Sequence, residues 1–386
     1  MGRVIRSVTA GTYKQIAKPL LFKRHPDKVH ADLVRLGKLF PKLPGIRSVP
    51  KVWSYQNAKL EQTVFGVKFR NPVGLAAGFD KNIELAKLMR SVGFGFVTGG
   101  SVTAEVCEGN PHPWFYRLPA SQSLVVHAGL PNKGVEHISR TIDAYGRHDF
   151  SSMPLIVSVA KTNSPAVVSD EAAIDDYRRS FIRLEATPHI ALYELNISCP
   201  NTYGGEPFTT PARLQSLLKA IDELKLQRPL IIKMPISLPW QAFYALLKVI
   251  DAHHVDGLSI GNLLKDRARA TLREQVPSDV AGGLSGVPTR AIATDLIRKS
   301  YQHYPGRFII IGIGGVFSAE DAYEKIRAGA NLVGLITGMI FEGPQVVGDI
   351  NSGIINLLKR DGFSRIEEAV GADYKNDKWY TRSTNR

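Results

Sequence analysis

Short apolar runs alternate with amphipathic stretches of helical length along most of this chain. Eight runs of strand length follow one another from residue 65 onward, at residues 73–77, 94–98, 155–160, 192–197, 230–234, 257–260, 308–313 and 332–336. Amphipathic stretches lie between most of them, at residues 172–184, 214–226, 240–252, 289–301 and 319–328. Eight strands in alternation with helices are what a closed parallel barrel requires. We therefore predict an α/β fold, a (β/α)8 barrel, with a doubly wound open sheet as the alternative.

The length and composition fit one large domain with small additions. The chain has 386 residues, 44% of them hydrophobic, so it can bury a large core, and its 34 glycines and 23 prolines suit many short loops. No repeat or long linker interrupts residues 51–372, which we assign to the barrel. Residues 1–50 form a separate helical segment. The polar residues 373–386 are expected to be a loosely held or tag-like tail without a function.

The N-terminal segment is strongly basic. Residues 1–50 contain eleven Lys and Arg against two Asp, a net charge of +9 out of +14 for the whole chain. An amphipathic stretch at residues 10–23, interrupted or kinked at Pro19, precedes a second one that begins near Pro26 and is ended by Pro41, Pro44 and Pro50. This pattern predicts a small helical hairpin. It either packs on the core or lies, through residues 1–45, on an anionic membrane surface.

Several classes of protein are disfavoured by the composition. The two cysteines, Cys107 and Cys199, form no CxxC motif and no Cys/His cluster, which argues against a disulfide scaffold, a metal site or an iron–sulfur cluster and fits a reducing compartment. Basic residues do not alternate with stacking aromatics, so we expect no nucleic acid partner. The chain lacks an apolar run of about 18 residues and an apolar secretory signal, so we expect no transmembrane helix and no secretion.

Polar side chains gather where the fourth predicted strand ends. Asn196, Cys199 and Asn201 follow an apolar run and precede Gly204 and Gly205. In a parallel barrel the carboxyl ends of the strands surround one pocket, where catalytic groups sit. The amides can bind the edge of a planar polar ligand, and a thiol can act as a base or nucleophile. The alternative is an Asn-rich turn around an inert thiol.

Glycine-rich loops follow the last two predicted strands. Residues 312–316 read Gly-Ile-Gly-Gly-Val, and residues 336–338 read Ile-Thr-Gly. Successive glycine N–H groups can bind a phosphate, and barrels often build a phosphate site at this position. Lys81, Lys233 and Asn262 also end strands or follow them. Lys233 ends a strand with nothing polar before it, so it is expected to point into the pocket and to stabilise a negatively charged ring.

Five motifs together resemble the dihydroorotate dehydrogenase family, and the resemblance covers most of the chain. They lie at residues 78–81 (GFDK), 196–201 (NISCPN), 282–288 (GGLSGVP), 313–316 as an IGGV stretch, and 337–344 (TGMIFEGP). Residues 13–44, with HPDKVH at 25–30, resemble the helical extension of the membrane-bound, quinone-reducing class. The family consists of FMN enzymes on (β/α)8 barrels. The resemblance implies that dihydroorotate loses a proton to an enzyme base and a hydride to the flavin, giving orotate, and that a quinone reoxidises the flavin.

The resemblance also implies roles for individual residues. Cys199 stands at the position of the base. The residues expected to hold FMN are Ala77, Gly78, Lys81, Ser101, Ser158, Asn196, Lys233, Gly261, Gly286, Gly314, Gly315, Ile336 and Thr337. The residues expected to hold the substrate are Lys81, His127, Ala128, Gly129, Leu130, Asn196, Asn201 and Asn262.

The chain departs from the family pattern at three positions. The membrane-bound class carries Ser as its base, whereas Cys199 and the motif around it are similar to the soluble classes. Val126 stands where the family has an Asn that binds the orotate ring, and a lost buried hydrogen bond costs about 1–3 kcal/mol. His127 is the candidate to compensate. Ser158 replaces an Asn beside the flavin and keeps its hydrogen-bonding capacity.

These departures leave other functions open. The leading prediction is a quinone-coupled dihydroorotate dehydrogenase, peripheral on the cytoplasmic face of a bacterial inner membrane, with the mitochondrial inner membrane as the alternative. Val126 motivates a second prediction, a paralogous FMN oxidoreductase acting on another small cyclic or carboxylate compound. A peripheral flavoprotein with little turnover and a barrel lyase without flavin are less favoured, because neither needs Cys199, Lys233 and three amides at one rim.

Overall fold

A computed structural model describes residues 2–39 and 52–375. Eight parallel strands form a closed barrel, in chain order β3 (Val73–Leu75), β4 (Phe96–Val102), β7 (Leu155–Val159), β8 (Ile190–Asn196), β9 (Leu230–Met234), β10 (Gly257–Ile260), β12 (Ile309–Ile313) and β13 (Leu332–Leu335). The last strand pairs with the first, with Gly334 opposite Gly74. The predicted (β/α)8 barrel is confirmed, and each of the eight predicted apolar runs overlaps one barrel strand. The open sheet is excluded by the closure.

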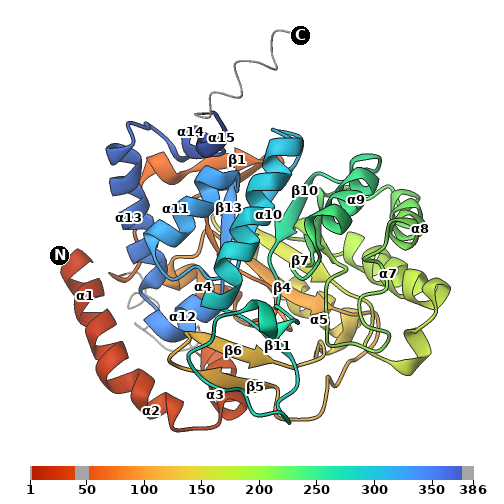
Figure 1. The fold of residues 1–386 in the computed structure, drawn as a ribbon, viewed down its shortest axis with the longest axis horizontal. Helices are drawn as coiled ribbons and strands as arrows, with labels where there is room; N and C mark the ends of the chain where they lie inside the picture. The colour runs from red at the N-terminus through yellow and green to blue at the C-terminus, as the bar shows by residue number, and fades with distance from the viewer. Residues whose placement is uncertain (1, 40–51, 376–386) are drawn as a thin grey trace.

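Helices surround the barrel (Figure 1). The predicted amphipathic stretches correspond to α7 (Asp170–Glu185), α8 (Pro211–Asp222), α9 (Trp240–Asp251), α10 (Arg290–His303) and α11 (Ala319–Ala328). The remaining helices of the barrel region are α4 (Ala86–Val92), α5 (Gly134–Asp143), α6 (Arg147–Phe150), α12 (Thr337–Glu342), α13 (Val346–Arg360), α14 (Ile366–Ala369) and α15 (Ala372–Lys375). Short 3-10 turns lie at Ala58–Leu60, Pro165–Val167, Arg267–Arg269 and Val287–Thr289.

The barrel interior is apolar at the end where the strands begin. One cluster of buried side chains fills this end: Val64, Phe69, Phe96, Ile156, Leu192, Ile231, Ile311 and Leu332. The hairpin β1 (Gln62–Val64) and β2 (Val67–Phe69) contributes to the cluster, and the Phe69 and Phe96 rings meet edge to face. A Cβ at Gly74 would lie 2.2 Å from the Phe96 ring, so glycine is required there. The apolar end leaves the opposite end of the barrel for polar groups.

A small antiparallel sheet lies beside the carboxyl ends of the barrel strands. It consists of β5 (Phe115–Leu118), β6 (Ser123–Val126) and β11 (Gly283–Leu284), with β6 in the centre. Val126 faces Phe115 on one side and Gly283 on the other. This sheet carries residue 126 to the rim of the barrel.

The N-terminal segment contains two helical arms, as predicted. The first runs through α1 (Gly2–Thr12), a π-helical turn (Tyr13–Ala17) and α2 (Lys18–Phe22), and the second is α3 (Pro26–Leu39). The first arm begins at Gly2 rather than near residue 10. Its irregular turn precedes Pro19, which has no N–H to continue an α-helical ladder. Pro41, Pro44 and Pro50, predicted to end the second arm, lie outside the described residues.

The first arm rests on the barrel's outer helices along its length (Figure 1). Buried Arg6 donates to Asp349 of α13 at 2.8 Å, and Trp53 Nε1 donates to Thr9 at 3.1 Å. The Tyr13 hydroxyl donates to the Ile340 carbonyl at 2.7 Å. Among the described residues, no helix is both long and apolar enough to cross a membrane.

The predicted tail starts within ordered structure. Asp373 belongs to α15 and pairs with Arg327 of α11 at 2.8 Å, so it is not loosely held. Sequence reasoning missed this contact because the two residues lie far apart in the chain. Residues 376–386 lie outside the described part.

Candidate active site

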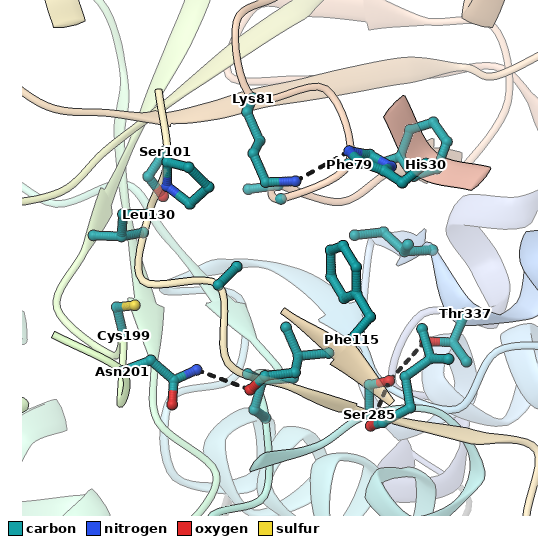
Figure 2. A pocket seen from close by; sticks show the side chains of 18 of the residues that line it. His30, Phe79, Lys81, Ser101, Phe115, Leu130, Cys199, Asn201, Ser285 and Thr337 are labelled. Carbon is teal, nitrogen blue, oxygen red and sulfur yellow. Dashed lines mark hydrogen bonds between the residues drawn. The ribbon is translucent and has the colours of Figure 1, made fainter. Parts of the chain in front are cut away.

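A large cavity opens at the carboxyl ends of the barrel strands (Figure 2). It encloses about 1250 Å³, including space open to solvent. Its wall combines barrel residues, the small sheet and helix α3, which contributes Pro26, Val29, His30 and Leu33. Thirteen predicted site residues line it beside Cys199: Ala77, Gly78, Lys81, Ser101, Ala128, Gly129, Leu130, Asn196, Asn201, Lys233, Asn262, Ile336 and Thr337. Segments far apart in the sequence therefore meet at one site.

A second, narrower cavity of about 530 Å³ adjoins the first. The two share Ala77, Lys233, Asn262, Leu263, Ser285, Ile336 and Thr337 as lining residues. The second is lined by the predicted phosphate-binding glycines Gly314 and Gly315, together with Gly261 and Gly286. A Cβ at Gly286 would lie 2.2 Å from the Gln122 carbonyl oxygen, and its φ of +75° also favours glycine. Glycine at residue 286 therefore lets this loop pack directly against the Gln122 backbone beside the cavity.

Cys199 lies where β8 gives way to its loop and faces the larger cavity (Figure 2). Burial raises the pKa of the Cys199 thiol to about 11. The backbone N–H of Asn201 and the ammonium groups of Lys233 and Lys161 lower this pKa, while Glu206 raises it. At pH 8 about one thiol in a thousand is therefore a thiolate. The group can accept a proton, and its fraction in the reactive form rises with pH.

The three predicted asparagines are already oriented by the protein. Asn196 Nδ2 donates to Ser101 Oγ at 2.8 Å, and its Oδ1 accepts from the Ser198 N–H at 3.1 Å. Asn201 Nδ2 donates to the Val126 carbonyl at 3.0 Å. Asn262 Nδ2 donates to Ser198 Oγ at 2.7 Å. These bonds fix the amides before any ligand arrives.

Lys81 contacts the N-terminal segment (Figure 2). Its Nζ lies 3.2 Å from Nε2 of His30 on α3. Burial, with the help of Lys81, lowers the pKa of His30 to about 3, so the ring is neutral and accepts from the ammonium. Burial also lowers the pKa of Lys81 to about 8, against the effect of Asp80 and Asp27. At neutral pH Lys81 therefore carries a charge that can bind a carboxylate.

Lys233 and Glu194 form a buried pair on neighbouring strands. Lys233 Nζ lies 3.9 Å from Glu194 Oε1, and their side chains are 8% and 1% exposed. Glu194 Oε1 has no hydrogen-bond partner within the described parts of the chain. Lys233 lines both cavities, as the sequence predicted for its side chain.

Two predicted site residues do not line either cavity. His127 turns away from the larger cavity, and its Nε2 lies 3.2 Å from Asn110 Nδ2, so it does not stand in for the missing Asn at Val126. Because Val126 lines the cavity at the end of β6, the next side chain points to the other side of the strand. Ser158 lies behind the wall, with its Oγ 2.9 Å from Ser101 Oγ. It supports Ser101 and, through it, Asn196.

Sequence reasoning did not assign roles to several residues at the site. Phe115, Arg117 and Ser285 line the cavity, and Thr337 Oγ1 donates to Ser285 Oγ at 3.0 Å. His30 lies in the HPDKVH motif at residues 25–30, but the motif predicted no role for its side chain. The indication that could have identified it is a polar residue on the apolar side of a predicted amphipathic helix.

Comparison with known proteins gives one consistent result. The sequence model of the family described as dihydroorotate dehydrogenase matches residues 59–358. A protein named dihydroorotate dehydrogenase (quinone) from Nostoc punctiforme is 33% identical over 95% of this chain and 99% of its own length. One of the same name from Halobacterium salinarum is 34% identical over 93% of this chain and 99% of its own length.

A solved structure agrees with the sequence relatives. The crystal structure of DHODH from Eimeria tenella in complex with ferulenol has a TM-score of 0.77 and 27% identity, covering 90% of this chain and 96% of that chain. The family match spans all eight barrel strands and includes the residues around both cavities except those of α3. This chain belongs to the dihydroorotate dehydrogenase family and resembles its quinone-dependent members along nearly its whole length.

Proposed function

We propose that this protein oxidises dihydroorotate to orotate with bound FMN and passes the electrons to a quinone. The observation that carries the proposal is the joint placement of Cys199, three oriented amides and Lys81 around one cavity that adjoins a glycine-lined cleft. A base, a set of amide contacts and a cation for a carboxylate are what removal of a proton from a small cyclic acid requires. The names of the relatives support this substrate and this acceptor.

The second cavity fits the phosphate end of FMN. Gly314 and Gly315 lie on its wall with φ values of +101° and +68°, and a Cβ at Gly315 would lie 2.5 Å from Arg290 Cβ. Backbone N–H groups of such glycines can bind phosphate oxygens. Lys233, Asn196, Ser101 and Thr337, at or near the junction of the cavities, would hold the ring system. When bound, FMN would supply a hydride acceptor and a two-electron carrier at this junction.

The chain's own residues supply proton transfer and orientation. Cys199, as the thiolate, takes a proton from the substrate carbon and becomes the neutral thiol. Lys81 binds the substrate carboxylate, and Asn196, Asn201 and Asn262 orient the ring through their amides. Helix α3 covers part of the cavity, which would limit the access of water to the reacting atoms.

Val126 supports a second candidate function. Its side chain lines the cavity and can neither donate nor accept a hydrogen bond, and His127 does not replace the missing amide. A ring with fewer polar atoms on that edge would lose less free energy here than orotate does. The alternative is therefore a paralogous FMN oxidoreductase with a different small carboxylate substrate.

Anaerobic mixing with dihydroorotate tests the proposal. We expect the flavin absorbance to bleach, and the released chromophore to have the mass of FMN. At saturating substrate the bleaching rate should rise about tenfold per pH unit from pH 7 to 10, because the thiolate fraction of a group with a pKa near 11 does so. Substrate affinity should fall above about pH 8, where Lys81 loses its charge.

Two outcomes would contradict parts of this proposal. Protein that dithionite reduces but dihydroorotate does not would favour the paralogous oxidoreductase. A bleaching rate that does not change between pH 7 and 10 would exclude Cys199 as the base while leaving the substrate intact.

We further propose that the N-terminal arms dock the protein on an anionic membrane and admit the quinone. Residues of α3 form part of the cavity wall, so a quinone that enters beside α3 would reach the flavin site. The arms expose the apolar side chains Val4, Val8, Ile16, Leu20, Leu33, Leu36 and Leu39 beside many basic residues. Such a surface binds lipid by burial and by charge. The cytoplasmic face of a bacterial inner membrane is the proposed location, with the mitochondrial inner membrane as the alternative.

Replacement of two exposed leucines tests the membrane proposal. We expect Leu20→Ser with Leu36→Ser to lower binding to anionic vesicles more than tenfold, because each buried Leu contributes about 1.5–3 kcal/mol. The matched control is Ile182→Ser, which has the same 59% exposure as Leu20 but lies on α7. Cosedimentation measures both. Equal binding of the two variants would exclude the arms as the membrane surface.

A further inference from the structure

The loop that carries Cys199 is hydrogen-bonded to a short segment, residues 161–163, that follows β7. After β7 ends, Lys161 Nζ donates to the Tyr203 carbonyl at 2.7 Å, and Asn163 Oδ1 accepts from the Tyr203 N–H at 2.7 Å. Lys161 is 3% exposed, whereas the Tyr203 residue is 54% exposed, so the backbone rather than the ring anchors the loop. Two side chains two residues apart thus bind both polar groups of one residue.

The same segment ties the Cys199 loop to the loop at residues 127–131. Asn163 Nδ2 donates to the Gly129 carbonyl at 3.0 Å and to Asn110 Oδ1 at 3.1 Å. Asn110 Nδ2 in turn donates to the Asn201 carbonyl at 3.0 Å. The two loops that border the larger cavity are therefore connected through Asn110 and Asn163.

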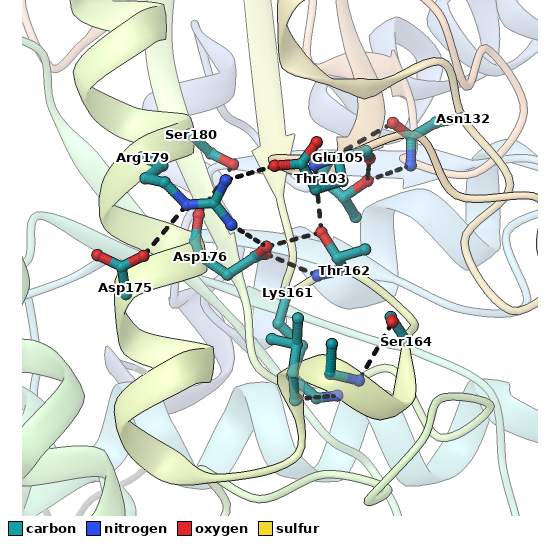
Figure 3. A network of polar contacts seen from close by, with 12 residues as sticks. Thr103, Glu105, Asn132, Lys161, Thr162, Ser164, Asp175, Asp176, Arg179 and Ser180 are labelled. Atoms are coloured by element: carbon teal, nitrogen blue, oxygen red, sulfur yellow. Dashed lines mark hydrogen bonds and ion pairs between the residues drawn. The ribbon is translucent and has the colours of Figure 1, made fainter.

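The segment itself is fixed by a network of polar contacts around the buried Thr162 and Asp176 (Figure 3). The N–H and Oγ1 of Thr162 donate to the carboxylate of Asp176 on α7, at 2.7 and 2.8 Å. The Glu105 N–H donates to Thr162 Oγ1 at 3.3 Å, and Arg179 pairs with Asp176 at 3.2 Å. Lys161 and Asn163 lie on either side of Thr162. Their side chains therefore extend from a stretch of backbone that the contacts of Thr162 hold in place.

Lys161 and Cys199 also line one small cavity. It encloses about 210 Å³ and lies on the side of Cys199 where Lys161, Tyr177, Thr202 and Pro207 meet. Lys161 and Lys233 favour the thiolate form of Cys199, whereas Glu206 disfavours it. Glu206 is itself paired with Lys265, at 2.8 Å. Burial lowers the pKa of Lys161, while Cys199, Asp176 and Cys107 raise it.

We propose that Lys161 and Asn163 are positioning residues for Cys199. Both side chains clamp the Tyr203 backbone through hydrogen bonds to its carbonyl and N–H groups, and the charge of Lys161 also stabilises the Cys199 thiolate. The inference rests on the proposed role of Cys199 as the base. A charge close to a thiol and shielded from water acts more strongly than a surface charge, because the surrounding medium screens it less. Asn163 shares the clamping role but carries no charge, so the two effects can be separated.

The test compares Lys161→Met with Asn163→Ala in the flavin-loaded protein without substrate. Mass spectrometry follows iodoacetamide modification of the peptide that contains Cys199, from pH 7.5 to 10. We expect K161M to slow modification about three- to tenfold throughout this range, because fewer thiols are ionised. K161R, which keeps the charge, should restore most of the rate. N163A should leave the pH dependence unchanged.

Hydrogen exchange measures the clamp separately. Both K161M and N163A should speed amide exchange over residues 199–206, and N163A should act most directly, since it removes the acceptor of the Tyr203 N–H. If K161M does not fold, K161Q takes its place. Unchanged modification in K161M or K161Q would overturn the electrostatic role, and unchanged exchange in N163A would overturn the clamp. Neither measurement uses dihydroorotate, so failure here is distinct from failure of the proposed activity.

Discussion

Replacement of Cys199 by alanine should slow the bleaching of the flavin by dihydroorotate about 10²–10⁴-fold, the usual contribution of a positioned base. The thiol faces the cavity at the end of β8, and the amide groups of Asn196, Asn201 and Asn262 stand around it. Alanine removes the proton acceptor and leaves those amides in place. Binding of orotate should therefore change little while the rate falls, and stopped-flow absorbance with an orotate titration measures the two separately.

The second cysteine provides a matched control. Cys107 is also buried, with its Sγ 3.3 Å from the Gly129 carbonyl, but it does not line either large cavity. We expect Cys107→Ala to change the bleaching rate less than about threefold, since it removes one weak hydrogen bond. Cys199→Ser should retain intermediate activity, because a hydroxyl can accept the proton but ionises less readily. A C199A variant within tenfold of wild type would mean that another group is the base.

The barrel was predictable because each of its strands can be recognised from the strand's own residues. Strands buried on both faces are near-continuous apolar runs, so each run identifies a strand without knowledge of its neighbours. The hairpin β1–β2 and the strands of the small sheet were not predicted, because they are short and only partly apolar. The first helical arm extends to Gly2 because Arg6 finds a partner in Asp349, 343 residues away. A contact between residues so far apart in the chain cannot be recognised from the sequence around either residue.

The site was predictable in part for the same reason. The glycines of the narrower cavity and Cys199 stand in compact motifs, whereas the proposed roles of His30, Lys161 and Asn163 follow from contacts between distant segments. The candidate His127 does not line the cavity, whereas its neighbour Val126 does, because side chains alternate along a strand. Residue identity and order determined the motifs, while packing determined which side chains line the cavity.

Replacement of Lys233 by methionine should lower the free energy of unfolding by about 3–5 kcal/mol, because it leaves the buried carboxylate of Glu194 without its cation. The pair lies 3.9 Å apart with both side chains almost completely buried. The double variant Lys233→Met with Glu194→Gln removes both charges and should recover most of the lost stability. Urea unfolding of the flavin-free protein measures this difference. Lys265→Met, which breaks the more exposed pair with Glu206, should cost less than about 1 kcal/mol.

The double variant also separates the structural role of Lys233 from its chemical role. A protein with K233M and E194Q is expected to fold and still to bleach slowly with dihydroorotate, since the cation that would balance negative charge on the reduced flavin is gone. If the double variant bleached at the wild-type rate, Lys233 would serve only to neutralise Glu194. If K233M were as stable as the double variant, Glu194 would not depend on Lys233 for its burial. A stable but slow double variant is the result expected of a lysine that both neutralises a buried acid and faces the flavin.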